Sequence, residues 1–191
     1  GDSIIEMTTT LESRPYVDLT MKALADFDVK VENEDYRIFR ISGNQKYSSG
    51  IYEVEGDYSQ LAFFAVAGAI GQKEIRCIGL DRKSLQGDKV IVDIMREMGA
   101  DIEEITGGYL IRPSKTRGTV IDIKECPDLV PALSVLASLS EGETRIINGE
   151  RLKIKESNRL ESTSRELMKM GADISICKDS LSIRGVKGFK A

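Results

Sequence analysis

The residues with the clearest chemical potential lie between Arg151 and Arg159, where the sequence RLKIKESNR places four cations and one carboxylate in nine positions. Buried strands rarely carry so many charges, because each charge would need a partner away from water. Arginine can hold a phosphate or a carboxylate through two hydrogen bonds, and lysine can add a point charge. The formal net charge of the chain is -4, so this concentration of positive charge is local. The stretch is therefore a candidate site for an anion.

A helix is predicted to follow this stretch and to begin near Ser157, because Ser157 and Asn158 are both suitable N-cap residues. Lys155 and Arg159 would then flank the start of the helix, where free backbone N–H groups and the helix dipole already favour anions. Glu156 lies between two cations, which should favour its ionised form, and a carboxylate held there could take and return a proton. On charge pattern alone a second interpretation stays open, a solvated turn with a capping salt bridge.

Composition places the chain among soluble globular proteins. The 191 residues are 41% hydrophobic and 30% charged, a balance typical of folded domains with a real core. The negative net charge gives no reason to expect a nucleic acid partner. No run of about 18 apolar residues predicts a membrane span, and no leader predicts secretion. We therefore expect a cytoplasmic protein without a membrane partner.

Cysteine and histidine usage narrows the chemistry. Cys77, Cys126 and Cys177 are an odd number without tight spacing, which argues against a disulfide framework and against a zinc site. We expect buried, reduced thiols and no metal centre. Histidine is absent, so acid–base work near neutral pH would fall to Asp, Glu, Lys or Tyr side chains.

An internal repeat organises the elements that must position these residues. Three segments share one pattern, an amphipathic helix ending at a turn and then two alternating strands joined by a polar turn. The turns fall at Asp28, Gly99 and Gly171, so the spacings are 71 and 72 residues. Glycine suits a helix end because it takes the left-handed backbone conformation freely, whereas Asp is a weaker choice. The segments are residues 21–43, 92–114 and 164–186.

The other half of the repeat is a buried helix. Residues 58–71 and 128–142 are mostly apolar with small side chains, and each follows a short strand ending at an acidic residue, Asp57 or Asp128, that could cap the helix. One unit is therefore β-α-β-α-β-β, and the chain is predicted to be an α/β protein with two full units and part of a third. A polar, glycine-bearing stretch, residues 42–50, separates a first domain, 1–51, from a second, 52–191.

Five motifs, which follow one another in the same chain order as in the family, resemble the 5-enolpyruvylshikimate-3-phosphate synthase family. KESNRLESTSRELMKMGADI resembles the family's Lys-Glu-Ser/Thr-Asp-Arg segment and its helix, although Asn158 stands where the family usually has Asp. The others are ESRPYVDLT, VEGDYSQLAFF, SLQGD and IDIKECPDLVP. The resemblance implies the inside-out barrel of enolpyruvyl transferases, built from six such units in two domains. It also implies that this chain is an interior fragment, with residues 1–51 as the tail of the domain that binds shikimate 3-phosphate.

The resemblance implies transfer of an enolpyruvyl group from phosphoenolpyruvate to the 5-hydroxyl of shikimate 3-phosphate, in the pathway to aromatic amino acids. Asp128 would act as the base, and Glu156 would transfer protons during addition and elimination. Lys155 would share in proton transfer and contact phosphoenolpyruvate, which Arg159 would bind. Neither a metal nor an organic cofactor is implied.

The same resemblance gives the first segment a role in substrate binding. Ser13 would hold the phosphate of shikimate 3-phosphate, with Tyr16 close by and Arg14 as a further cation. The partners are thus two small-molecule substrates, and the intact protein is expected to be a monomer. Because other family segments for both substrates are missing, the chain alone is expected to be inactive.

Two alternatives stay open at this point. The sister enolpyruvyl transferase acts on UDP-N-acetylglucosamine, and it usually carries a reactive Cys in a glycine-rich loop that has no counterpart here. A non-catalytic anion-binding module that reuses the repeat is the second alternative. Turnover would separate the enzyme from the module, and the choice of acceptor would separate the two transferases.

Overall fold

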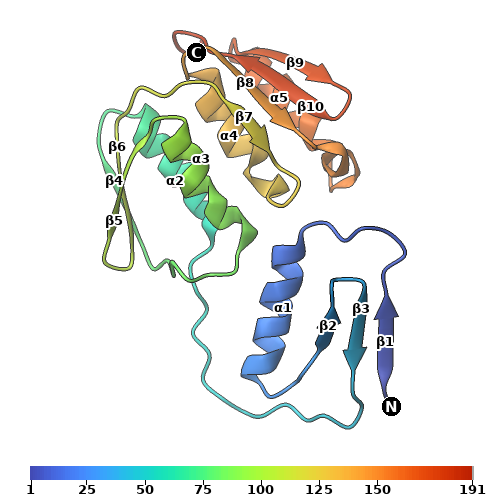
Figure 1. The fold of residues 1–191 in the computed structure, drawn as a ribbon. Helices are drawn as coiled ribbons and strands as arrows, with labels where there is room; N and C mark the ends of the chain where they lie inside the picture. Colours follow the sequence, from blue (N-terminus) through green and yellow to red (C-terminus); the bar gives the residue numbers. More distant parts are fainter. Residues whose placement is uncertain (191) are drawn as a thin grey trace. The chain divides into compact units, whose positions relative to one another are not determined.

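The computed structural model describes residues 1–190, which form two compact units (Figure 1). The first unit contains Gly1–Val54 and Leu85–Gly87, and the second contains Glu55–Ser84 and the residues from Asp88 onward. The sequence prediction of two domains, 1–51 and 52–191, concerns the domains of a longer protein and stays a prediction.

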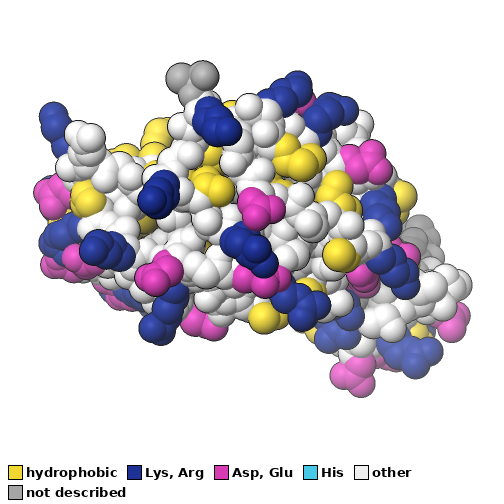
Figure 2. All heavy atoms as spheres, turned by 90° about the horizontal axis from the view of Figure 1, so that it is seen from above, with side chains coloured by type: hydrophobic (Ala, Val, Ile, Leu, Met, Phe, Trp, Pro, Cys, Tyr) yellow, Lys and Arg dark blue, Asp and Glu magenta, His cyan; other side chains and the backbone are white. Residues whose placement is uncertain are grey.

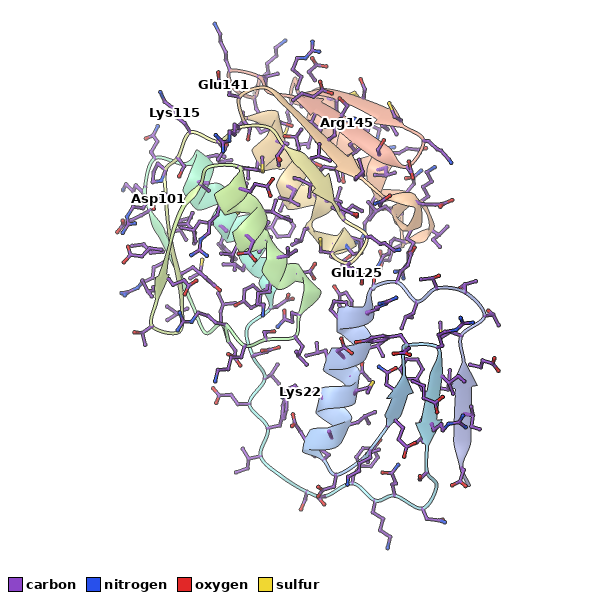
Figure 3. All side chains as sticks on the ribbon, viewed as in Figure 1. Lys22, Asp101, Lys115, Glu125, Glu141 and Arg145 are labelled. Atoms are coloured by element: carbon purple, nitrogen blue, oxygen red, sulfur yellow. The ribbon has the colours of Figure 1, made fainter. Side chains whose placement is uncertain are left out.

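The first unit combines one helix with a small sheet. The helix begins with Pro15 in its first turn, where the fixed backbone of proline suits a helix start. The sheet has the order β1-β3-β2, with both pairings antiparallel. Val29, between α1 and β2, and Phe39, in β3, are buried apolar side chains of this unit. Lys22 and Asp26 form an ion pair of 2.9 Å along the helix (Figure 3). The elements are β1 (Ser3–Glu6), α1 (Arg14–Asp26), β2 (Glu32–Glu34) and β3 (Ile38–Ile41).

The second unit contains two copies of the repeated arrangement. The earlier copy has an antiparallel sheet of order β4-β6-β5, and the later copy has a sheet of order β7-β8-β10-β9 in which only β7 and β8 run parallel. The earlier copy contains α2 (Tyr58–Ile70), β4 (Ile75–Ile78), η1 (Gly87–Val90, whose first residue belongs to the first unit), α3 (Ile91–Glu97), β5 (Asp101–Ile105) and β6 (Gly108–Arg112). The later copy contains β7 (Val120–Asp122), η2 (Pro127–Leu129), α4 (Val130–Ser138), β8 (Glu143–Ile147), η3 (Glu150–Ile154), α5 (Arg159–Lys169), β9 (Asp173–Cys177) and β10 (Ser180–Arg184).

The later copy has the predicted β-α-β-α-β-β order, whereas the earlier copy lacks its first strand. Residues 51–57 are neither helix nor strand. Ile51 and Val54 stay in water, so these two side chains gain no packing energy to offset the entropy lost when a backbone is ordered. One backbone hydrogen bond nevertheless joins this segment to the end of β4, where the Gly56 N–H donates to the Gly79 carbonyl at 2.9 Å. Asp57 caps α2 as predicted, and its carboxylate accepts from the Ser59 N–H at 2.7 Å.

The three helix ends share one hydrogen-bond pattern. The backbone is left-handed at Asp28 (φ 64°), Gly99 (φ 98°) and Gly171 (φ 89°). In each copy this residue donates to a carbonyl three positions earlier, and the next residue donates to one five positions earlier. This pair of bonds satisfies carbonyls that the helix leaves open. The repeat predicted from the turn spacing is therefore confirmed at the level of single hydrogen bonds.

Replacing Gly171 by Ala is expected to lower the free energy of unfolding by about 1–2 kcal/mol, because left-handed backbone costs an L-residue about that much. The three atoms nearest to a Cβ atom there all belong to the Lys190 side chain, the closest at 3.3 Å, and that side chain can move. Gly188→Ala is the matched control, since its Cβ would meet open space, and we expect a change within about 0.5 kcal/mol. Urea denaturation followed by circular dichroism measures both. Equal effects would contradict the backbone argument.

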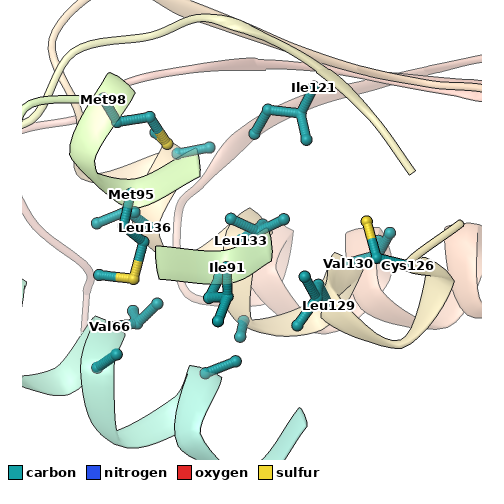
Figure 4. Close-up of a cluster of buried hydrophobic side chains, with 14 of the residues drawn as sticks. Val66, Ile91, Met95, Met98, Ile121, Cys126, Leu129, Val130, Leu133 and Leu136 are labelled. Atoms are coloured by element: carbon teal, nitrogen blue, oxygen red, sulfur yellow. The ribbon is translucent and has the colours of Figure 1, made fainter. Parts of the chain in front are cut away.

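The core of the second unit forms where the two buried helices meet. Helices α2 and α4 pack against each other, as their small and apolar side chains predict. Side chains from α3 and from the β7–α4 connection fill the space around them (Figure 4). The cluster includes Val66, Ile91, Met95, Met98, Ile121, Cys126, Leu129, Val130, Leu133 and Leu136.

The cysteines are free, as predicted, but only one is buried. Cys126 lies in the core, where burial is the main reason that its thiol pKa rises to about 12. Burial also raises the pKa of the half-buried Cys77. The predicted burial of Cys177 is wrong, because its side chain lies on the exposed face of β9 at the end of that strand.

The surface mixes charges of both signs. On the face shown in Figure 2, Lys and Arg side chains are interspersed with Asp and Glu side chains. This agrees with the small net charge of -4. Within residues 1–190, no helix has both the length and the apolarity that crossing a membrane requires.

Candidate active site

Asp128 lies on the connection between β7 and α4, the loop that also carries Glu125 (Figure 3). This connection contains the short 3-10 helix η2, which starts with Pro127. The predicted cap role of Asp128 is wrong. The N-cap positions of η2 and α4 belong to Cys126 and Leu129, so Asp128 is inside a helical turn. Its carboxylate is directed toward the basic stretch instead.

The basic stretch is fixed by two helical elements. The 3-10 helix η3 ends at Ile154, Lys155 has extended backbone, and α5 begins at Arg159. Asn158 is the N-cap of α5, and its side-chain oxygen accepts from the Glu161 N–H at 3.4 Å. The helix therefore starts two residues later than Ser157, and of the two predicted N-cap candidates Asn158 has the role. An amide oxygen caps as well as a carboxylate does, so Asn158 needs no negative charge here.

Four of the predicted site residues form one ion cluster. Arg159 donates from Nη1 to Asp128 Oδ1 and, over 2.9 Å, from Nη2 to Glu156 Oε2. The Lys155 ammonium lies 3.8 Å from the same Asp128 oxygen. The side chains of Arg159, Asp128 and Lys155 are 25–28% exposed, whereas that of Glu156 is 79% exposed. Contacts between residues about thirty positions apart exclude the interpretation as a simple local turn.

Protonation states follow from these contacts. The pKa of Glu156 is lowered by a backbone N–H of its own and then by the hydrogen bond and charge of Arg159. Burial opposes the charge of Arg159, but the bonds to Asp128 and Glu156 outweigh it, and the pKa of Arg159 is raised. Glu156 is therefore ionised at neutral pH, so it must first accept a proton before it can donate one.

The first-unit candidates lie together at the start of α1. Ser13 is the N-cap residue, with left-handed backbone at φ 54°. The Arg14 guanidinium lies 5.0 Å from the centre of the Tyr36 ring, a cation–π contact, and its Nε donates to the Leu11 carbonyl at 3.4 Å. Tyr16 is 40% exposed. These three side chains belong to one compact unit, and the ion cluster belongs to the other.

Sequence reasoning missed the residues that form a pocket beside Arg14. The pocket has a volume of about 400 Å³ and a largely polar wall. Tyr36 contributes to this wall, and its hydroxyl donates to the Asp18 carboxylate at 2.8 Å, which raises the Tyr36 pKa. No signal in the sequence joins these segments, because the pairing of β1 with β3 brings them together. The pocket is lined by Met7, Thr8, Thr9, Thr10, Leu11, Arg14, Asp35, Tyr36 and Arg37.

Across residues 1–190, no group of three or more His, Cys, Asp or Glu side chains has the arrangement to hold a metal ion. The ion cluster mixes cations with carboxylates, a set that suits anionic groups and proton transfer rather than metal binding.

Comparison with protein families decides the ancestry of the chain. The family model described as EPSP synthase (3-phosphoshikimate 1-carboxyvinyltransferase) matches residues 2–191. The chain belongs to the EPSP synthase family. A 3-phosphoshikimate 1-carboxyvinyltransferase from Clostridium kluyveri is 52% identical to it over 190 residues, covering 100% of this chain and 44% of that protein. The enzyme of the same name from Clostridium novyi is 52% identical over 185 residues, covering 97% of this chain and 42% of that protein. The chain thus spans less than half the length of these EPSP synthases.

Solved structures confirm the predicted enolpyruvyl transferase fold. EPSP synthase from Acinetobacter baumannii matches with a TM-score of 0.77 and 23% identity, over 100% of this chain and 44% of that one. The enolpyruvyl transferase NikO from Streptomyces tendae matches with a TM-score of 0.68 and 16% identity, over 97% of this chain and 43% of that one. At these identities the likeness concerns the EPSP synthase fold alone.

Proposed function

We propose that this chain is part of a longer 3-phosphoshikimate 1-carboxyvinyltransferase. The complete enzyme transfers the enolpyruvyl group of phosphoenolpyruvate to the 5-hydroxyl of shikimate 3-phosphate and releases phosphate. The observation that carries the proposal is the ion cluster of Asp128, Lys155, Glu156 and Arg159. It combines carboxylates for proton transfer with cations for an anionic substrate, within a chain of the EPSP synthase family.

In this proposal the cluster divides the chemistry by position. Asp128 takes the proton of the 5-hydroxyl, whose oxygen forms a bond to the central carbon of phosphoenolpyruvate. The methylene carbon gains a proton at the same stage, and Glu156 and Lys155 handle this proton and the one lost in elimination. The carbon–oxygen bond to phosphate then breaks, and phosphate leaves. Arg159 binds phosphoenolpyruvate through its guanidinium, which suits both carboxylate and phosphate groups.

The first unit contributes groups for shikimate 3-phosphate. Ser13 binds the substrate phosphate through its hydroxyl, with Tyr16 beside it. Arg14 supplies positive charge, and its contact with the Tyr36 ring limits its side-chain freedom. We also propose that the longer enzyme is a cytoplasmic monomer and takes no partner beyond its two substrates.

Two other functions use the same cluster differently. A transferase for UDP-N-acetylglucosamine shares the phosphoenolpyruvate chemistry but accepts a different alcohol. A non-catalytic anion-binding module would need the cations and no proton transfer. The pairing of both carboxylates with Arg159 favours an enzyme, because a simple anion site gains nothing from carboxylates at its binding group.

The longer protein is expected to release phosphate from phosphoenolpyruvate only when shikimate 3-phosphate is present. The reason is that the acceptor hydroxyl must attack before phosphate can leave. A colorimetric phosphate assay, run with shikimate 3-phosphate, with UDP-N-acetylglucosamine and with neither, measures this. Release that depends on UDP-N-acetylglucosamine would move the protein to the sister activity, and no release with either acceptor would favour the binding module.

A further inference from the structure

We infer that the carboxylates of Asp128 and Glu156 compete with the anionic substrate for Arg159, so that anion binding and release of these carboxylates are one event. The inference rests on the proposed function in taking Arg159 as the anion-binding residue. It adds that the carboxylates of the site neutralise its own cations.

The first argument is the use of the Arg159 hydrogen bonds. A guanidinium holds a phosphate or carboxylate best with two N–H donors on one edge. Both terminal nitrogens of Arg159 already donate, Nη1 to Asp128 and Nη2 to Glu156. An incoming anion that takes the edge between these two nitrogens therefore meets two bound carboxylates. At least one of them must move before a two-bond contact can form on this edge.

The second argument is charge. Lys155 and Arg159 carry two positive charges, and Asp128 and Glu156 carry two negative charges, so the charges of these four groups sum to zero. A neutral cluster attracts an anion weakly in water. Once a carboxylate moves away, the cations face the ligand with net positive charge. Binding therefore becomes favourable only together with this movement.

The third argument identifies which carboxylate leaves more easily. Glu156 is 79% exposed and lies three residues before Arg159 on a flexible side chain, so water can replace its bond. Asp128 is 28% exposed, and the Lys155 ammonium lies 3.8 Å from the Asp128 oxygen that Arg159 also contacts. Asp128 is also the proposed base. An anion that displaces it from Arg159 frees a carboxylate oxygen for the acceptor hydroxyl, which couples occupation by phosphoenolpyruvate to the first proton transfer.

The test is inorganic phosphate binding to the 191-residue chain and to two variants, Glu156→Gln and Asp128→Asn. Each variant keeps its shape but loses the charge that holds Arg159. The free energy of an exposed ion pair corresponds to about a 1.4- to 5-fold change in affinity, so Glu156→Gln should tighten phosphate binding by that factor. We expect Asp128→Asn to tighten binding at least as much, because its pair with Arg159 is less exposed. The shift of the Arg159 side-chain N–H signals in NMR titrations reports binding at this residue.

Glu161→Gln is the matched control. Glu161 lies in the first turn of α5, and among residues 1–190 its side chain forms no ion pair or hydrogen bond, so the substitution changes the charge without freeing Arg159. We expect less effect from it than from either test variant. Equal tightening in all three would mean that only the general surface potential matters, and would overturn the inference. Unchanged or weaker binding in Glu156→Gln and Asp128→Asn would also overturn it, because the carboxylates would then hold Arg159 in place for the anion. Phosphate binding needs no acceptor and no turnover, so it can succeed even if the proposed acceptor is wrong.

Discussion

Replacing Asp128 by Asn in the longer enzyme is expected to lower kcat by about 10²- to 10⁴-fold, the range that loss of a positioned general base produces. An amide cannot take the proton of the acceptor hydroxyl. It does keep the size of the side chain and an oxygen that can accept from Arg159 and Lys155, so the cluster should stay assembled. The KM for phosphoenolpyruvate should not rise, because a neutral amide competes for Arg159 less strongly than a carboxylate does and no ligand for the substrate is lost. Steady-state kinetics with both substrates varied measures the two constants.

Asp122→Asn is the control for this experiment. Asp122 lies at the end of β7, six positions before Asp128, and its carboxylate accepts from the Lys124 N–H at 2.9 Å and from the Asn148 side chain at 2.8 Å. The substitution has the same chemistry at the strand end that leads into the connection carrying Asp128, but it lies outside the ion cluster. We expect kcat to stay within a few-fold of the parent, consistent with a structural role for this carboxylate. A kcat for Asp128→Asn within tenfold of the parent would mean that another group is the base.

Much of the fold could be predicted because the repeat is encoded by local chemistry. The turns at Gly99 and Gly171 need left-handed backbone, which glycine supplies, and the helices before them show an apolar face at helical spacing. Asp28 shows the limit of this reasoning, because it takes the same conformation at φ 64° without the residue that favours it. Only its place in the repeat identifies it. The absence of a strand before Asp57 could not be predicted, because a strand depends on a partner and on burial that the segment itself does not encode.

The candidate site was predictable in its residue types but not in its connections. The density of cations between Arg151 and Arg159 is visible in the sequence, and so is the position of Glu156 among them. The contact between Asp128 and Arg159 depends on tertiary structure, because it requires the β7–α4 connection to lie beside the start of α5. A local rule assigned Asp128 to a helix cap, which the structure gives to other residues. The pocket beside Arg14 was missed for the same reason, since strand pairing forms it.

The 191-residue chain alone is expected to show no turnover, even with both substrates at saturating concentration. Catalysis between two substrates needs groups held within about 0.5 Å of productive positions. The chain spans 44% of the length of its Clostridium kluyveri relative, so the proposed enzyme must supply further substrate-binding groups. Arg159 should still bind phosphate weakly, because its surroundings are local to the second unit, and this binding should weaken as salt screens the charges.

A phosphate-release assay on the purified chain, with the longer enzyme as the positive control, tests this expectation. Release above the blank without enzyme would show that the chain holds a complete site, and the proposal of a longer functional enzyme would fail. The Arg159→Ala variant shows whether a chain without turnover is folded or misfolded. If the chain is folded and its site is partly built, this variant should lose the phosphate-induced shifts of neighbouring backbone signals in NMR titrations while its circular dichroism stays unchanged. If Arg159→Ala retained these shifts, phosphate would bind elsewhere, and the assignment of Arg159 as the anion-binding residue would be wrong.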